Sequence, residues 1–465
     1  MQYFFVFYFF SFFILLAVKP EKYGEFSYAF NFTLSLVYGL LLIAFLWQQR
    51  RVTRNWLRPD VIFLIGFTIV HIQIPFLASI GVEPYMPDFV WVNKEVVNYA
   101  TWMSVVAACS WMLGFSLLSK HTESLTPLPD KQFGINFRVY DTFLLVVFFS
   151  FIMLVGQSFL KGAYNNSAWG SGASYAYLIL GSMLHLRIIY FFKDMPYGAT
   201  FRYLIAQGFN NKIFFSVLLA YCALFMMTGS RGEILSIVLV VATVYSIFVK
   251  PVSLKAVIIG VMIGAVLFNI LGAGRGRDHT QFEDGNIFAR GYESLQQSES
   301  KKGITSELAS SVRIQYRAID TVPDKHPYLY GVTYITAITS AVPFLTGLYL
   351  DLFDVPYQYG ASTRFFTFIG QGQFHSYGEG SEILADIYIN FGLVSVFVIM
   401  FVFGAFLGLV SHKGRGKKFN YLIIYVAFSM SAIYINRSHL LLPLASIVYL
   451  YFLHLMFSKK KMALN

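Results

Sequence analysis

Long apolar runs recur along this chain from its first residues to its last. Runs of about 17–25 apolar residues can cross the roughly 30 Å hydrocarbon core of a bilayer as α-helices. Composition agrees, because 57% of the 465 residues are hydrophobic and only 13% are charged, whereas about one quarter of a soluble domain is charged. The sequence therefore predicts an all-α polytopic membrane protein. We expect about twelve transmembrane helices, at residues 2–18, 28–47, 60–80, 99–118, 139–159, 174–192, 213–229, 234–249, 256–273, 382–410, 420–435 and 440–457.

Positive charges predict one orientation for these helices. Lysine and arginine concentrate in the cytoplasmic connections of membrane proteins. Here they fall in every second connection, at 50–58, 120–138, 193–212, 250–255 and 413–418, and in the tail at 459–461. Both termini are therefore expected in the cytoplasm. The net charge of +11 then favours membrane lipid headgroups, and not nucleic acid, as a partner.

One connection, residues 274–381, is far longer than the others and is expected on the outer face. Within it, residues 311–320 predict a helix that carries Arg313 and Arg317 one turn apart on one face. Residues 328–350 are apolar but are interrupted by glycine and proline, which favours a re-entrant or interface-lying segment. The expected organisation is nine transmembrane helices in 1–273, the large loop with short helices in 274–381, and three helices with a basic tail in 382–465.

Arginines on the expected outer face are candidates for binding an anion. Arg231 and Arg437 lie in very short turns between spans. Arginine suits phosphate because its planar fork donates two parallel hydrogen bonds and keeps its charge. A ligand at this position must be anionic and must lie at the bilayer surface, and a lipid-linked phosphate meets both conditions. The alternative is that these arginines are interfacial anchors or pair with nearby acids. The further candidates in the long loop are Arg290, Arg313, Arg317 and Arg364.

Acids and histidines near the same face are candidates for a general base. His375 and Glu382 lie where the long loop leads into the next span, and acids at the mouth of a span are costly. The alternative for Glu382 is helix capping, with Ser381 as the N-cap. Glu233 follows Arg231 by two residues, and its alternative role is to pair with that or another arginine.

Metal and cofactor sites are not expected. The sequence contains no Asp-x-Asp pair and no His/Cys cluster at ligand spacing. It also contains no Gly-rich phosphate loop, so an ATP-driven pump is not expected.

The chain resembles the O-antigen polymerase (Wzy-type) family of bacterial oligosaccharide repeat-unit polymerases. The resemblance lies in three stretches of sequence, in the number of spans and in the large late loop. Residues 228–232 are similar to the family's Ser-Arg-Gly turn. Arg317, followed by a Tyr-Gly pair, resembles the loop arginine that precedes a glycine, and Arg313 is an alternative match. Residues 382–392 resemble the acidic, aromatic and Asn-Phe-Gly start of the span after the loop. Related O-antigen ligases carry a histidine where Ser381 lies here, which favours polymerase over ligase.

The resemblance implies a GT-C-like glycosyltransferase of the bacterial inner membrane. A hydroxyl of one undecaprenyl-diphosphate-linked oligosaccharide attacks the anomeric carbon of another at the periplasmic face. Undecaprenyl diphosphate then leaves without a metal ion, ATP or any other cofactor. We expect Arg231 and Arg317, helped by Arg313 or Arg437, to bind the diphosphate, and Glu382 or His375 to act as the base. The expected further substrate contacts are Arg290, Arg364 and Tyr377.

Other functions and partners stay open at this point. A chain-length regulator protein is a possible partner. A flippase for the same lipid-linked sugar would favour internal repeats and ionisable groups near mid-membrane, whereas the charges here concentrate at one face. A membrane-bound acyltransferase would need an embedded catalytic histidine, and the histidines here are scattered.

Overall fold

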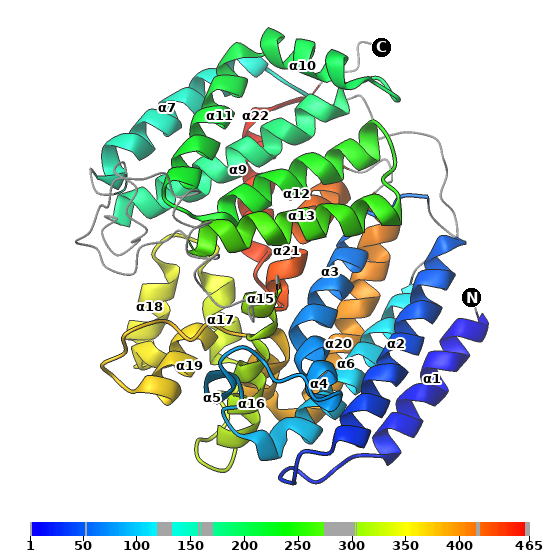
Figure 1. Ribbon diagram of the computed structural model, residues 1–465. Coiled ribbons are helices and arrows are strands. Elements are labelled where there is room, and N and C mark those ends of the chain that lie inside the picture. The colour runs from blue at the N-terminus through cyan, green and yellow to red at the C-terminus, as the bar shows by residue number, and fades with distance from the viewer. Residues whose placement is uncertain are drawn as a thin grey trace.

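The protein is a bundle of helices with a group of short helices at one end (Figure 1). The computed structural model describes residues 2–51, 54–118, 133–156, 159, 171–273, 303, 305–414 and 419–460. The helices up to residue 273 are α1 (Gln2–Ala17), α2 (Tyr28–Arg50), α3 (Pro59–Phe67), the π-helix η1 (Thr68–Ile72), α4 (Gln73–Ser79), α5 (Pro87–Val90), the 3₁₀ helix η2 (Lys94–Val96), α6 (Val97–Leu118), α7 (Phe137–Val155), α9 (Ser171–Lys193), α10 (Phe201–Asn210), α11 (Lys212–Met227), α12 (Arg231–Phe248) and α13 (Leu254–Ala273). Those after it are α15 (Ser306–Ala309), α16 (Val312–Thr321), α17 (Val332–Thr339), α18 (Leu345–Leu352), the 3₁₀ helix η4 (Tyr357–Tyr359), α19 (Ser362–Gln371), α20 (Ile383–Lys413), α21 (Phe419–Ile435) and α22 (Leu444–Phe457).

Helices suited to crossing a membrane dominate the described chain. Seven are long and apolar enough: Tyr28–Arg50, Pro59–Ser79, Lys94–Leu118, Phe137–Val155, Gly172–Lys193, Arg231–Phe248 and Ile383–Lys413. The pair α10 and α11, bent by 104°, is an eighth if it forms one span. Shorter apolar helices are Tyr3–Ala17, Leu254–Leu267, Phe419–Ile435 and Leu444–Phe457. The prediction of a helical multi-pass membrane protein is confirmed. The twelve expected spans all coincide with helices, but crossing by all twelve stays a prediction.

Two short strands depart from the all-α expectation. β1 (Phe133–Ile135) and β2 (Ser458–Lys460) pair antiparallel, with Gly134 opposite Lys459. The pair joins the segment before α7 to the end of α22.

Helices α6 and α20 approach each other closely. A Cβ added at Gly404 would overlap the carbonyl oxygen of Trp111, and one at Gly114 would overlap that of Phe401. Small residues allow membrane helices to pack backbone against backbone. These two glycines therefore fix how near α6 and α20 can lie.

Helix α20 is broken at Gly392, where φ is 79° and ψ is −174°. Its 31 residues would extend about 46 Å as a continuous helix, longer than a bilayer core. The part of α20 before the break forms hydrogen bonds with the segment that precedes α17. The backbone N–H of Leu329 donates to Ile389 O at 2.9 Å, and that of Gly331 donates to Asn390 Oδ1 at 3.0 Å.

Short helices α15–α19 belong to the described part of the expected outer loop. Helices α16–α19 gather with α5 at one end of the molecule, whereas α15 lies nearer its middle (Figure 1). The predicted helix at 311–320 is α16. The apolar stretch at 328–350 forms α17 and α18, of eight residues each, which are too short to cross a membrane. Phe344, Leu348 and Leu352 between and along them are exposed, as an interface-lying segment requires.

Candidate functional site

A cavity of about 1070 Å³ lies among α9, α12, α13 and α21. Apolar side chains line most of it, among them Leu239 on α12 and Val257 and Val261 on α13. Charged and hydroxyl side chains at the start of α12 and after α21 line it as well, including Arg231 and Arg437. The cavity therefore combines an apolar wall, contributed by apolar helices, with a cationic region.

The turn between α11 and α12 places Arg231. Gly229 has a φ of 67°, a left-handed conformation that glycine adopts without strain. The N–H of Ser230 closes the turn on Phe225 O at 3.0 Å, and Ser230 is the N-cap residue of α12. Arg231 is then the first residue of α12, so its backbone is fixed by two packed helices.

Arg231 and Arg437 meet on one carboxylate, that of Glu307 in α15. Arg231 donates from Nη1 to Oε2 at 2.9 Å and from Nη2 to Oε1 at 2.6 Å. Arg437 donates from Nη1 to Oε1 at 3.4 Å. We call these three residues the cavity cluster. The turn that carries Arg437 is anchored on α3, because the neighbouring Asn436 donates from Nδ2 to Phe63 O at 3.1 Å.

The charges of the cavity cluster keep Glu307 ionised. Burial opposes its ionisation, but the hydrogen bonds and charges of Arg231 and Arg437 outweigh burial and lower its pKa to about 2. Two guanidinium groups then face the one carboxylate of Glu307, so these three side chains together carry a net charge of about +1.

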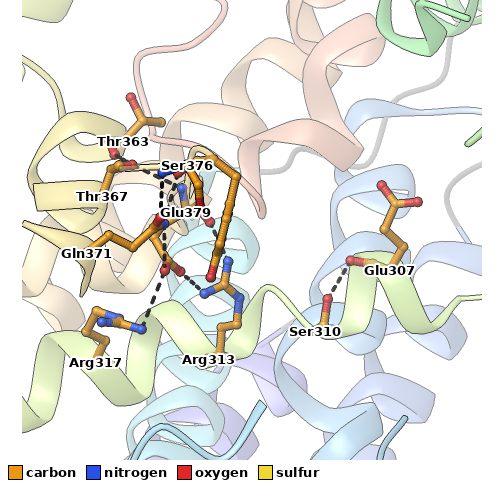
Figure 2. Close-up of polar contacts among 10 residues, drawn as sticks. Glu307, Ser310, Arg313, Arg317, Thr363, Thr367, Gln371, Ser376 and Glu379 are labelled. Carbon is orange, nitrogen blue, oxygen red and sulfur yellow. Dashed lines mark hydrogen bonds and ion pairs between the residues drawn. The ribbon is translucent and has the colours of Figure 1, made fainter. Parts of the chain in front are cut away.

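A second pair of arginines lies on α16 and shares Glu379 (Figure 2). Arg313 contacts the Glu379 carboxylate and donates from Nη2 to its backbone oxygen at 2.9 Å. Arg317 Nη2 lies 3.7 Å from Glu379 Oε1, and Gln371 donates to the same oxygen at 3.2 Å. Gly370 leaves room for this arrangement, since a Cβ there would lie 2.5 Å from Nη1 of Arg317. We call Arg313, Arg317 and Glu379 the loop cluster.

The two clusters influence each other although only the cavity cluster lines the cavity. Glu307 lies on α15, which directly precedes α16 (Figure 2). Burial, together with the charges of Arg317 and Arg437, lowers the pKa of Arg313 to about 10, against a raising effect of Tyr377. Arg313 stays protonated at neutral pH, so four arginines and two glutamates form one cationic region.

Other residues predicted from the sequence lie around the loop cluster. Tyr377 is half-exposed, and its backbone oxygen accepts a hydrogen bond from Gln371 at 2.9 Å. Arg364 stacks on the Tyr357 ring, 3.8 Å from its centroid. His375 is exposed on the same loop. Arg290 lies outside the described residues.

Glu382 is fully buried at the start of α20. Its carboxylate accepts from the backbone N–H groups of Leu384 and Ala385 at 2.6 and 2.7 Å, and His71 Nε2 lies 3.1 Å from Oε1. Glu382 itself is the N-cap, one residue later than the expected Ser381, whose hydroxyl donates to Ser362 at 2.8 Å.

Among the described residues no ion pair joins Glu233 to an arginine, and the arginines at 275, 277 and 290 lie outside them. Its carboxylate accepts from the hydroxyl groups of Ser230 and Tyr177. Within the part of the chain that the structure describes, no three His, Cys, Asp or Glu side chains form a group that could hold a metal ion.

The two bridging acids, Glu307 and Glu379, were missed by reasoning from the sequence. Glu379 lies four residues after His375 in a stretch rich in polar residues, but no spacing rule marks it out. Glu307 opens a four-residue helix, and an acid in the first turn of a helix has an ordinary explanation in the helix dipole. Docking of the loop on the bundle brings Glu307 to Arg231 and Arg437, and folding within the loop brings Glu379 to its two arginines.

Comparison with known proteins identifies a relationship over nearly the whole chain. A family model described as O-antigen polysaccharide polymerase Wzy matches residues 1–461. No curated protein and no solved structure matches. The family match includes the first half of the chain, where the sequence alone offered only a similar pattern of hydropathy, and it confirms the resemblance drawn from the motifs.

Proposed function

Because the chain belongs to the O-antigen polysaccharide polymerase Wzy family, we propose that it joins undecaprenyl-diphosphate-linked oligosaccharide repeat units into a surface polysaccharide. The family supports a polymerase role on lipid-linked oligosaccharides, and the helices support a multi-pass membrane protein. The undecaprenyl carrier, the periplasmic face of the inner membrane and transfer without a metal ion are the finer parts of the proposal.

The observation that carries the proposal is the amphiphilic cavity. Its apolar wall along α12 and α13 suits part of an isoprenoid chain, because van der Waals packing drives the association of apolar groups within a bilayer. Arg231 and Arg437 line the same cavity and suit the diphosphate. A soluble sugar nucleotide has no apolar chain that could contact this wall.

The cavity cluster supports the chemistry as well as the binding. Breaking the bond between the anomeric carbon and the diphosphate develops negative charge on the leaving group. Preoriented donors stabilise such charge without reorganisation at the moment of reaction. Glu307 orients both guanidinium groups before substrate binds, and the diphosphate, which carries more charge, then takes over these donors.

The loop cluster is proposed as a second set of contacts to the same class of anion. Arg313 and Arg317 lie beside the cavity cluster and share its excess of positive charge. Arg364, Tyr377 and Arg290 are proposed as contacts to the sugars. Arginine and tyrosine side chains suit sugars because hydroxyl groups and rings need both polar and stacking partners.

We also propose that all twelve apolar helices cross the membrane, with both termini in the cytoplasm and residues 274–381 outside. A GT-C-like arrangement and a chain-length regulator as partner are further parts of this proposal. Cysteines introduced at Gln373 and at Ser253, both exposed, test the orientation. A membrane-impermeant thiol reagent should label the first in intact spheroplasts and not the second, and the reverse pattern would contradict the orientation.

Reconstitution tests the function directly. The purified protein in proteoliposomes with undecaprenyl-diphosphate-linked repeat units should produce a ladder of polymer lengths, and it should do so in excess EDTA. Movement of the lipid-linked sugar between leaflets without polymer would indicate a flippase. Transfer of single units to a lipid A core acceptor would indicate a ligase. Loss of polymer in EDTA that magnesium restores would contradict the metal-independent step.

A further inference from the structure

Glu233 presents a carboxylate to the cavity from the first turn of α12, the same turn that carries Arg231. The hydroxyl of Tyr177, on α9, donates to Oε1 at 2.9 Å, and Ser230 donates to Oε2. The carboxylate is therefore held by neutral donors from two helices, beside an arginine that is directed at a different acid. A carboxylate with only neutral donors keeps lone pairs available for a proton.

The other acid that lines the cavity cannot easily accept a proton. Glu307 contacts two arginines, and their charges lower its pKa to about 2. Such a carboxylate is a weak base because accepting a proton breaks its pairing with both guanidinium groups.

The two candidate bases from the sequence are less well placed. Glu382 uses both carboxylate oxygens to cap α20, and it does not line the cavity. His375 lies on an exposed loop and does not line the cavity either. A base must come within hydrogen-bond reach of the hydroxyl that it activates, and of these residues only Glu233 lies beside the arginines that would hold the leaving group.

We infer that Glu233 is the general base of the glycosyl transfer, a role that rests on the proposed function. The oxygen of the acceptor hydroxyl forms a bond to the anomeric carbon of the donor sugar while the bond from that carbon to the diphosphate oxygen breaks. The electron pair of the broken bond leaves with undecaprenyl diphosphate, next to Arg231 and Arg437. The hydroxyl proton passes to the carboxylate of Glu233, and solvent later removes it.

Tyr177 and Ser230 act as positioning residues in this step. Their hydrogen bonds fix the direction of the Glu233 carboxylate, and a misplacement of about 1 Å can cost about a hundredfold in rate. Tyr177→Phe keeps the ring and removes the hydrogen bond. It should lower kcat and leave KM unchanged, whereas a purely structural role would lower the amount of folded protein.

The central variant is Glu233→Gln, with Glu95→Gln as the matched control because Glu95 is exposed on η2. Glutamine keeps the size of the side chain and an oxygen for Tyr177, but it cannot take the proton. In proteoliposomes we expect Glu233→Gln to polymerise about 10²–10⁴-fold more slowly with unchanged binding of the lipid-linked substrate, measured by native mass spectrometry. Glu95→Gln should match the wild type.

Two further variants keep the inference testable if Glu233→Gln is unstable. Glu233→Asp keeps the charge and withdraws it by one methylene, so it should retain partial activity. Glu233→Ala should regain activity in added formate, which can occupy the vacated space and accept the proton. Formate rescue supports the base, and a failure of formate to restore any rate argues against it.

Failure of the base and failure of the proposed function give different results. If the wild type makes polymer and Glu233→Gln makes it at the same rate, Glu233 is not the general base, and the proposed polymerase function is not affected. If Glu233→Gln loses substrate binding in proportion to rate, Glu233 binds substrate and is not the base. If the wild type makes no polymer from lipid-linked units, the proposed function itself is wrong.

Discussion

Replacing Arg231 with lysine should slow polymer formation about 10²–10³-fold. The guanidinium donates two hydrogen bonds, at 2.9 and 2.6 Å, to the two oxygens of one carboxylate, a geometry that two phosphate oxygens can also accept. Lysine keeps the charge but cannot span both oxygens, because its ammonium group is a single point donor. A preoriented donor to a developing negative charge is worth about 2.7–4 kcal/mol, which corresponds to that factor in rate.

The same substitution should change stability little. The side chains of Arg231 and Glu307 are 16% and 32% exposed, and Arg437 still reaches Glu307. Ion pairs with access to solvent contribute up to about 1 kcal/mol. The turn before α12 depends on Gly229 and on backbone hydrogen bonds, which the substitution does not touch.

The assay is the initial rate of the polymer ladder, normalised to the protein level in the membrane. Arg202→Lys is the matched control because Arg202 is exposed on α10. A wild-type ladder from well-expressed Arg231→Lys would refute the reasoning. A vanished protein band would instead assign Arg231 a structural role.

Three other substitutions follow from the geometry. The pKa of Glu307 is lowered in the folded protein from 4.5 to about 2, so its ion pairs stabilise the fold above pH 4.5 and lose effect as the pH falls towards 2. The difference in thermal stability between the wild type and Glu307→Gln should therefore be constant from pH 8 to 5 and decrease below pH 5. Gly370→Ala should displace Arg317 and lower polymer yield about tenfold to a hundredfold. Gly378→Ala, a change with open space around it, should leave the yield unchanged. Gly404→Ala should overlap a backbone oxygen of α6 and destabilise the protein by about 1–3 kcal/mol, while Gly39→Ala in α2, which meets nothing, should have wild-type thermal stability.

The helices could be predicted from the sequence because their signal is local. A single apolar run that crosses a bilayer can pair all its backbone N–H and C=O groups within itself only as a helix. Breaks within helices carry a weaker signal. Gly392 interrupts α20 with a positive φ, yet a glycine inside an apolar run is common in membrane helices. The 104° bend between α10 and α11 likewise depends on packing, and α10 was expected to be part of a connection.

The arginines of the candidate site could be proposed from the sequence because a charge in a short turn between spans needs an explanation. Their grouping could not, because Arg231 and Arg437 lie far apart in the chain and meet only through Glu307. The separation of Arg313 and Arg317 into a second cluster around Glu379 has the same origin. Pairing of this kind is a property of tertiary packing and leaves no mark on local spacing.

The most direct test of the cavity as the binding site is a structure of the protein with undecaprenyl diphosphate bound. We predict that the diphosphate lies between the guanidinium groups of Arg231 and Arg437, with Glu307 displaced from them and the first isoprenoid units between α12 and α13. A diphosphate bound elsewhere, with the contacts of Arg231 to Glu307 intact, would contradict this prediction.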